Sequence, residues 1–428
     1  MLGVSLGLLV STVFGAEASV EETVNPPEHV HFRVGARLEF RGGVPEGSVP
    51  GSRLTELEVD PVVGIGVPLR GADLTLAYEP RIFIVTHEVP AVEGDKVSYL
   101  HRGRLVLDAN PSPRLRLYVN ARAAYGQNDF LPLNTVLATS GSTGQPPTTP
   151  GTTPTAPTPN PGVGTLPPVR FLEVVDLDGS LGWIHSLSPR WSWLFSAGYR
   201  YAGGATVEAR DSLPLQKGPN ASTGLQWSAS RNDTLTFGLD ALHTRFSSGP
   251  IDTIVTVSST WTHAWSRAAG TDLTFGVGGF DSNLPAAQPS AQSGLSLKPV
   301  GGLGARYDWV TRSVVWRNSA TFLATPLSDP VSGVVNERLG GVILSTLSPT
   351  ERLVFSVTGA ASATLSTPQR DARVEAKMTY LFQPEIGVSV GGRAAWLEGS
   401  TLLGTNGFGW LAFVSVGVAV ETGRQPSL

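Results

Sequence analysis

Residues 407–421 read Gly-Phe-Gly-Trp-Leu-Ala-Phe-Val-Ser-Val-Gly-Val-Ala-Val-Glu, and this run decides the fold. Its even-numbered positions are all apolar, and its odd-numbered positions include the small or polar residues Gly407, Gly409, Ser415, Gly417, Ala419 and Glu421. Successive side chains of an extended backbone point to opposite faces, so the run predicts a strand with one apolar and one low, smooth face. Roughly ten such residues cross a bilayer as a tilted strand. Because a lone strand leaves its backbone groups unpaired in lipid, the run requires partners that close into a barrel.

The same alternation begins near the other end of the chain, where Val30, Phe32 and Val34 alternate with polar or small residues. Continued along the sequence, the period of two predicts about eighteen strands. They cover residues 29–41, 55–69, 73–87, 96–108, 114–127, 170–185, 190–203, 219–230, 233–246, 251–266, 271–282, 293–308, 312–324, 334–347, 351–365, 369–382, 385–398 and 405–421. Pro61, Pro80 and Pro299 fall inside predicted strands, where proline lacks the amide that a ladder needs. Pro61 and Pro80 are nearly equidistant from the turn at Arg70, so they are expected to face one another.

The connections between the predicted strands alternate between tight turns and longer loops. An up-and-down barrel has this asymmetry, because short periplasmic turns form one rim and long external loops form the other. An even number of strands places both ends of the barrel domain on the rim of short turns. The sequence therefore predicts an all-β, transmembrane, antiparallel barrel over residues 29–421.

The composition excludes several other classes. The chain has 428 residues, 41% of them hydrophobic, and a net charge of -4. Beyond the N-terminal segment it has no apolar run of about 18 residues, so a helical membrane protein is not expected. The charge gives no support to a nucleic-acid partner. Since cysteine is absent, disulfides and thiolate metal sites are excluded.

Three segments lie outside the alternating pattern. Residues 1–18 are apolar and end in a small-x-small motif, which predicts a signal peptide, although no basic residue precedes Arg33. A buried N-terminal helix is the alternative. Residues 19–28 are expected to form a periplasmic linker, and residues 422–428 a C-terminal tail. Residues 138–168 carry no charge and are rich in Thr, Pro and Gly, which predicts a disordered extracellular loop; a lumenal plug or a glycosylated spike are the alternatives.

The inward lanes of the first five and of the sixteenth and seventeenth predicted strands are charged. Closure brings the last strand beside the first, so these lanes are expected to form one wall of the lumen. The predicted wall consists of Arg33, Arg37, Glu39, Arg41, Glu56, Glu58, Asp60, Glu79, Arg81, Arg102, Arg104, Arg114, Arg116, Arg122, Arg373, Glu375, Lys377 and Arg393. The sixth to fifteenth strands point mainly Ser, Thr, Gly and a few Asp inward. Two interpretations stay open: a transverse field that orients a solute, or cross-strand pairs that stabilise a wet interior.

Eight of the ten tryptophans lie within several residues of a predicted short turn. Indole settles at the headgroup level of a bilayer, so they are expected to form a periplasmic aromatic girdle. The set is Trp183, Trp191, Trp193, Trp227, Trp261, Trp265, Trp309 and Trp316.

Catalytic and metal-binding patterns are weak. His29 and His31 share one strand face, and imidazoles so placed bind a metal only with further ligands. Asp176 and Asp178 also share a face, but paired carboxylates in a charged barrel are more often salt-bridge partners than a hydrolytic dyad. No nucleophile elbow or phosphate-binding loop occurs. We therefore expect neither an enzyme nor a bound cofactor or metal.

The signal-like N-terminus, the alternating lanes and the loop rhythm together resemble a Gram-negative outer-membrane β-barrel protein of porin-like architecture. Such barrels often end in the pattern polar-x-Gly-x-x-apolar-x-aromatic. Ser415, Gly417 and Val420 match its first part, whereas Thr422 replaces the aromatic residue. The resemblance implies an outer-membrane location, contact with lipid and insertion by the barrel-assembly machinery.

Three functions follow as hypotheses. The first is a channel that passes hydrophilic solutes through a polar lumen. The second is a conduit for exported polysaccharide that works with a periplasmic partner. The third is a plugged structural or adhesive surface barrel.

Overall fold

The computed structural model describes residues 30–44, 53–89, 97–128, 172–212, 214–283, 296–311, 314–328, 335–365, 370–383, 385–398 and 407–422. The predicted signal peptide, linker and Thr/Pro-rich loop lie outside these residues, as does the predicted tail apart from Thr422, which is the last residue of the final strand. The first strands are β1 (His31–Val44), β2 (Arg53–Leu69), β3 (Ala72–Tyr78), β4 (Arg81–Val89), β5 (Val97–Ser112), β6 (Leu115–Asn128), β7 (Leu172–Ser186), β8 (Trp191–Gly204) and β9 (Gln216–Ser228). They are followed by β10 (Asp233–Phe246), β11 (Ile251–Ala264), β12 (Ala269–Asn283), β13 (Ser296–Val310), β14 (Val315–Ser328), β15 (Val335–Thr350), β16 (Leu353–Thr364), β17 (Arg370–Gln383), β18 (Ile386–Glu398) and β19 (Gly407–Thr422).

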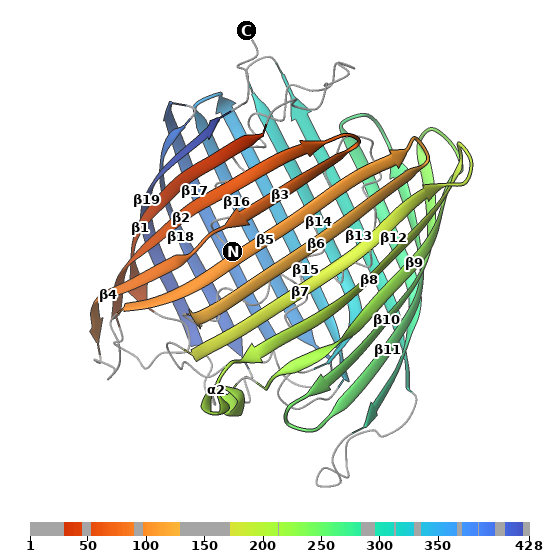
Figure 1. The fold of residues 1–428 in the computed structure, drawn as a ribbon, viewed down its shortest axis with the longest axis horizontal. Helices are drawn as coiled ribbons and strands as arrows, with labels where there is room; N and C mark the ends of the chain where they lie inside the picture. The colour runs from red at the N-terminus through yellow and green to blue at the C-terminus, as the bar shows by residue number, and fades with distance from the viewer. Residues whose placement is uncertain are drawn as a thin grey trace.

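The sheet closes on itself. β1 pairs with β2 on one side and with β19 on the other, from Phe32 opposite Thr422 to Val44 opposite Trp410. All other neighbouring strands are antiparallel, and they follow chain order apart from β3 and β4. These two short strands both lie between β2 and β5, and each pairs with both of them. Figure 1 shows the inclined strands as the staves of a barrel, with β1 and β19 side by side. Because β3 and β4 lie end to end in one stave, the barrel has eighteen staves, as the sequence predicted.

The break between β3 and β4 has a sequence cause. The register places Val63 opposite Tyr78 and Val59 opposite Ile82, so Pro61 lies opposite Pro80. Neither proline has an amide to donate, and the ladder is interrupted there. The predicted strand at 73–87 is therefore split in two. Pro299 lies in β13 where that strand pairs with β12, and the ladder to β14 begins two residues later, at Gly301.

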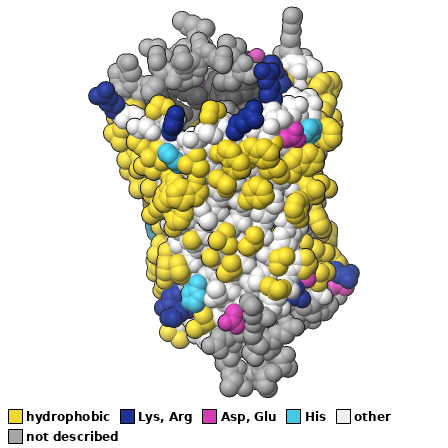
Figure 2. Space-filling view, turned by 90° about the vertical axis from the view of Figure 1, so that its right-hand side faces the viewer, with side chains coloured by type: hydrophobic (Ala, Val, Ile, Leu, Met, Phe, Trp, Pro, Cys, Tyr) yellow, Lys and Arg dark blue, Asp and Glu magenta, His cyan; other side chains and the backbone are white. Residues whose placement is uncertain are grey.

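Alternation places apolar residues outside and polar residues inside. In β1, Phe32, Leu38 and Phe40 are about half exposed, whereas Arg37 and Glu39 are 6% and 0% exposed. Figure 2 shows the result for one face: hydrophobic side chains cover the flank of the barrel, and charged ones lie mainly toward its two ends. A closed barrel with an apolar outer band satisfies every backbone group in lipid. The structure is accordingly that of a membrane-spanning β-barrel.

The two rims differ as predicted. Tight turns such as Arg70–Gly71 and Glu351–Arg352 form one rim, and Gly71 has a φ of 76°, which favours glycine. The described chain begins and ends on this rim, since Phe32 is paired with Thr422. The opposite rim carries the longer connections and the short helix α2 (Val207–Ser212), which the sequence analysis did not anticipate. The Thr206 hydroxyl caps that helix by accepting a hydrogen bond from the Ala209 amide at 3.1 Å. No helix among the described residues is long and apolar enough to cross a membrane.

One expectation for the last strand is wrong. The inner face of β19 was predicted to be a low strip of glycine and serine, but Leu411 and Phe413 also point inward and are 1% and 3% exposed. Both occupy odd-numbered positions, so strand alternation itself sends them to the lumen side. The strip is therefore partly filled by large apolar side chains.

Candidate functional site in the lumen

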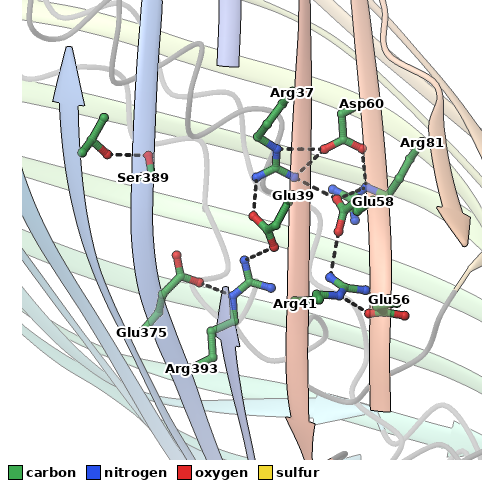
Figure 3. Close-up of polar contacts among 11 residues, drawn as sticks. Arg37, Glu39, Arg41, Glu56, Glu58, Asp60, Arg81, Glu375, Ser389 and Arg393 are labelled. Atoms are coloured by element: carbon green, nitrogen blue, oxygen red, sulfur yellow. Dashed lines mark hydrogen bonds and ion pairs between the residues drawn. The ribbon is translucent and has the colours of Figure 1, made fainter. Parts of the chain in front are cut away.

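A buried ion-pair network lies on the inner faces of β1, β2, β4 and β18. Arg37 of β1 is at its centre. Its Nη2 lies 2.8 Å from Glu58 Oε1 and also contacts Asp60, and its Nη1 lies 3.3 Å from Glu39 Oε2. The register puts Arg37 directly opposite Asp60, so the contacts follow from strand pairing. Figure 3 shows these side chains pointing toward one another from neighbouring strands.

Two further arginines complete the contacts of Glu58. Arg41 Nη1 lies 2.7 Å from Glu58 Oε2, and Arg41 also contacts Glu56. Arg81 of β4 places its Nε 3.0 Å from Glu58 Oε1 and 3.2 Å from Asp60 Oδ1. Both guanidinium groups lie over the ring of Phe83, at 5.2 and 5.5 Å from its centroid. Glu58, at 0% exposed, thus receives three cations, and an aromatic face covers two of them.

Arg393 extends the network to β17 and β19. Its Nε lies 2.7 Å from Glu375 Oε2, and its Nη2 lies 3.6 Å from Glu39 Oε1. Its guanidinium lies 4.9 Å from the centroid of Phe413. Next to this charged layer, Leu54, Val85, Ala395 and Leu411 form a buried apolar cluster. Five strands and the broken stave therefore share one compact inner layer on the lumen side of the sheet.

The remaining predicted wall residues flank this network and are less buried. Arg116 pairs with Asp108, and Arg122 Nη2 lies 2.9 Å from Asp178 Oδ2. Arg102 donates from Nε to the Glu79 carbonyl oxygen at 3.0 Å. Arg33, Arg104, Arg373 and Lys377 lie on the same inward lanes. Arg104 is placed directly opposite Arg122, so two like charges face each other there. Arg114 is a correction: it lies in the exposed turn before β6 and not on the wall.

The opposite wall carries many short hydroxyl side chains and glycines, among a few charged residues such as Arg200 and Asp252. Ser196 and Ser222 hydrogen-bond across β8 and β9 at 2.6 Å, and Thr260 and Thr274 across β11 and β12 at 2.9 Å. These residues are partly exposed, and each pair is directly opposite in register. The hydroxyls are donors and acceptors without fixed charge.

Sequence reasoning missed several charged positions beyond the predicted wall, and Arg338 and Arg200 are two of them. Arg338 of β15 is buried and places Nη2 2.6 Å from Asp371 Oδ1, and its Nε donates to Ser362 Oγ at 2.9 Å. Arg200 of β8 lies 4.0 Å from Asp176. Both arginines occupy the inward lane of a predicted strand, so the alternation was the signal that could have found them. Their partners lie on other strands, which the pattern alone does not pair.

The predicted girdle tryptophans gather at the rim of short turns, on outward lanes. Trp191 stacks with Trp227 at 5.7 Å, and Trp183 meets Trp193 edge-on at 5.6 Å. Across the β13–β14 hairpin, Trp309 lies 6.5 Å from Trp316. Trp261 and Trp265 both pack on His263. Their role at the membrane interface stays a prediction.

The weaker catalytic patterns do not assemble into a site. Asp178 pairs with Arg122 and Asp176 lies near Arg200, so both carboxylates face cations. Among the described residues, no group of three or more His, Cys, Asp and Glu side chains is arranged to hold a metal ion. His29 lies outside the described residues.

Chemically, the lumen offers two kinds of surface. The buried network pairs carboxylates with guanidinium groups inside the wall, which rigidifies that side. The hydroxyl wall presents neutral donors and acceptors that exchange hydrogen bonds with water or with a hydroxyl-rich solute.

Comparisons with known proteins give one family and several similar folds. Solved structures with similar folds include the outer membrane protein OpdK of Pseudomonas aeruginosa (8% identity, 92% of this chain and 99% of that chain, TM-score 0.44). They also include OccAB4 of Acinetobacter baumannii (8% identity, 93% and 100%, TM-score 0.45) and OccK8 of Pseudomonas aeruginosa (10% identity, 92% and 98%, TM-score 0.44). A comparison with curated protein sequences finds no match. The model of the EpsX exopolysaccharide export family matches residues 29–423, which contain every described strand of the barrel. The chain belongs to the EpsX exopolysaccharide export family.

Proposed function

We propose that this barrel is an outer-membrane conduit through which exopolysaccharide leaves the cell. The observation that carries the proposal is the family match over residues 29–423, because it covers the staves that form the lumen and not a separate domain. Barrels of 16 to 18 strands are wide enough to leave an aqueous channel. A hydrated sugar polymer requires such a water-filled path.

The two walls support this solute class. Side chains such as Ser222 and Thr260 offer neutral hydrogen-bond partners that match sugar hydroxyls without holding them by charge. On the other side, Glu39, Glu58 and Asp60 are already engaged by arginines. A lumen that binds weakly on one side and is rigid on the other favours passage of a polymer, because strong binding slows release.

Passive diffusion of small hydrophilic solutes is the second candidate, and the polar inner face of the barrel favours it directly. The two functions predict different defects in cells from which the gene is deleted. Deletion of the gene is expected to abolish surface polysaccharide and leave the uptake of small sugars unchanged if export is the function. The reverse result supports diffusion.

A matched pair of substitutions tests whether the polymer passes through the lumen itself. Ser222 points inward and its neighbour Ala221 points outward and is exposed. In cells that lack the native gene, Ser222→Trp combined with Thr260→Trp is expected to reduce surface polysaccharide, because two indoles narrow the lumen. Ala221→Trp is expected to restore wild-type levels. Equal export by both variants would contradict passage through the barrel.

Two further assignments belong to the proposal. A periplasmic partner delivers the polymer at the rim of short turns, and residues 138–168 form an external loop and not a plug. Single-channel conductance of the purified protein, with and without residues 138–168, separates an open lumen from a plugged structural barrel. A plugged barrel conducts no ions until the segment is removed.

A further inference from the structure

Arginine recurs in the short turns around the barrel. Within the described part of the chain, six of these turns contain one arginine each: Arg70, Arg114, Arg190, Arg231, Arg267 and Arg352. They follow β2, β5, β7, β9, β11 and β15, so they are distributed around the circumference and do not form one patch. The turn after β17 contains Glu385 instead.

These turn arginines differ from the arginines of the lumen. All six are exposed, and none of the six side chains forms an ion pair with another residue that the structure describes. Arg37, Arg41 and Arg81, by contrast, are buried and paired with carboxylates. The rim therefore presents exposed cations that pair with no carboxylate among the described residues.

The depth of the turn arginines is set by the outward aromatic residues beside them. Arg190 immediately precedes Trp191, and Arg267 follows the 64% exposed Trp265 by two residues. Arg231 lies in the turn that begins just after Trp227, which stacks on Trp191. Indole rings settle at the headgroup boundary, so residues one step further out reach the level of the phosphates. Figure 2 shows dark-blue side chains along the upper edge of the hydrophobic band, which is the end at which β19 finishes in Figure 1.

We propose that these six arginines form a ring that binds the phosphate groups of anionic phospholipids in the periplasmic leaflet. A guanidinium group donates two parallel hydrogen bonds to a phosphate, which makes arginine well suited to this contact. The six arginines are distributed around the barrel, and the lipid leaflet also surrounds the barrel on all sides. A periplasmic protein is the competing occupant. Arg190 and Arg267, however, lie within two residues of outward tryptophans in the sequence, and this places them at the lipid boundary and not at the mouth of the lumen.

The test uses full-length protein in phosphatidylcholine vesicles that contain a small fraction of brominated lipid. Bromine quenches nearby tryptophan fluorescence, and eight of the ten tryptophans lie near this rim. Brominated phosphatidylglycerol is expected to quench the tryptophans of the wild type more strongly than brominated phosphatidylcholine does. The expected difference corresponds to about fivefold enrichment of phosphatidylglycerol next to the rim. The triple variant Arg190→Gln, Arg231→Gln, Arg267→Gln is expected to lose most of this enrichment. The corresponding triple lysine variant is expected to keep it, and raised salt should weaken it.

A control pair lies on the opposite rim, where Lys217 and Arg245 are exposed, outward and directly opposite each other. Lys217→Gln with Arg245→Gln removes two outward cations far from the reporting tryptophans and is expected to leave the quenching ratio unchanged. Heat-modifiable migration in gels checks that each variant is folded; if the glutamine variant does not fold, the salt dependence of the wild type and the lysine variant decides. Equal quenching of the wild type by the two lipids would overturn the proposal. Equal quenching together with lost export in the glutamine variant would assign the ring to an acidic periplasmic protein, and would overturn it too.

Discussion

On β1, β2, β4 and β18 the inward side chains include long, charged and buried ones such as Arg37 and Glu58, whereas on β8, β9, β11 and β12 they include short, neutral and partly exposed ones such as Ser196 and Thr260. In the first region a single carboxylate has several partners from two strands, as Glu58 has Arg37 and Arg41 on β1 and Arg81 on β4. In the second region the hydrogen bonds join neutral groups in pairs, as between Ser222 and Ser196. The comparison teaches that the buried ion pairs of the closed barrel are concentrated on one side of the lumen, and under the proposed function the other side is the one that meets the solute. Four substitutions test this division.

The largest expected effect is that of Glu58→Gln. The change leaves three buried arginines short of a counter-charge, and breaking a buried pair in this way destabilises by about 3–5 kcal/mol. Urea unfolding of the purified barrel, followed by tryptophan fluorescence, measures the loss. Glu375→Gln is the control, since the side chain of Glu375 is 28% exposed and its pair with Arg393 is partly solvated. Similar losses for the two variants would mean that burial of the network does not matter.

The second substitution is Phe413→Ala. It removes the ring beneath Arg393 and opens a void beside the charged layer. We expect the free energy of unfolding to fall by about 3 kcal/mol. Phe408→Ala is the control on the same strand, because Phe408 points outward and is 61% exposed. A smaller loss for Phe413→Ala than for Phe408→Ala would show that the inner layer is not packed as described.

The hydroxyl wall is expected to respond weakly. Ser222→Ala removes the hydrogen bond between Ser196 and Ser222, and the loss of one such hydrogen bond reduces the free energy of unfolding by about 1 kcal/mol. The double variant Ser196→Ala, Ser222→Ala is expected to be nearly as stable as the wild type, because both polar groups are removed together. A double-mutant cycle in urea measures the coupling. An additive result would show that the two hydroxyls act independently.

The smallest expected effect concerns Arg104, which faces Arg122 at the edge of the charged wall. Arg104→Gln relieves repulsion between like charges, so stability should not fall, while the lumen loses one cation. The ratio of cation to anion permeability, obtained from reversal potentials in planar bilayers under a salt gradient, is expected to rise about twofold. Arg245→Gln, on the outer face, should leave the reversal potential unchanged. A shift of equal size in both variants would place the effect outside the lumen.

Much of the fold was predictable because it rests on local alternation. The run from Phe408 to Val420 fixed which side chains face lipid, and the spacing of turns fixed the number of staves. The opposition of Pro61 and Pro80 was also predictable, since it depends on counting from one turn. The helix α2 was not, because six residues carry too weak a periodic signal.

The candidate site was predictable in composition and not in arrangement. Alternation identified Arg37, Glu58 and Arg393 as inward residues, but it left open whether their charges face the solute or each other. The structure brings Arg37 and Glu58 together by the pairing of β1 with β2. It also brings Arg393 of β18 close to Glu39 of β1, because β19 closes the barrel between those two strands. Alternation also places Arg338 inward, but its contact with Asp371 could not be derived, because the two residues lie on β15 and β17 with β16 between them.

The sequence by itself determined the period of two, and with it the faces of every strand and the difference between the two rims. Only the tertiary structure decided which charged side chains form buried ion pairs and which stay exposed, such as Arg190 and Arg267 in the turns. The physical reason is the range of each interaction. The direction of a side chain is set by its own backbone, whereas its partner is set by inter-strand register and by closure of β1 on β19.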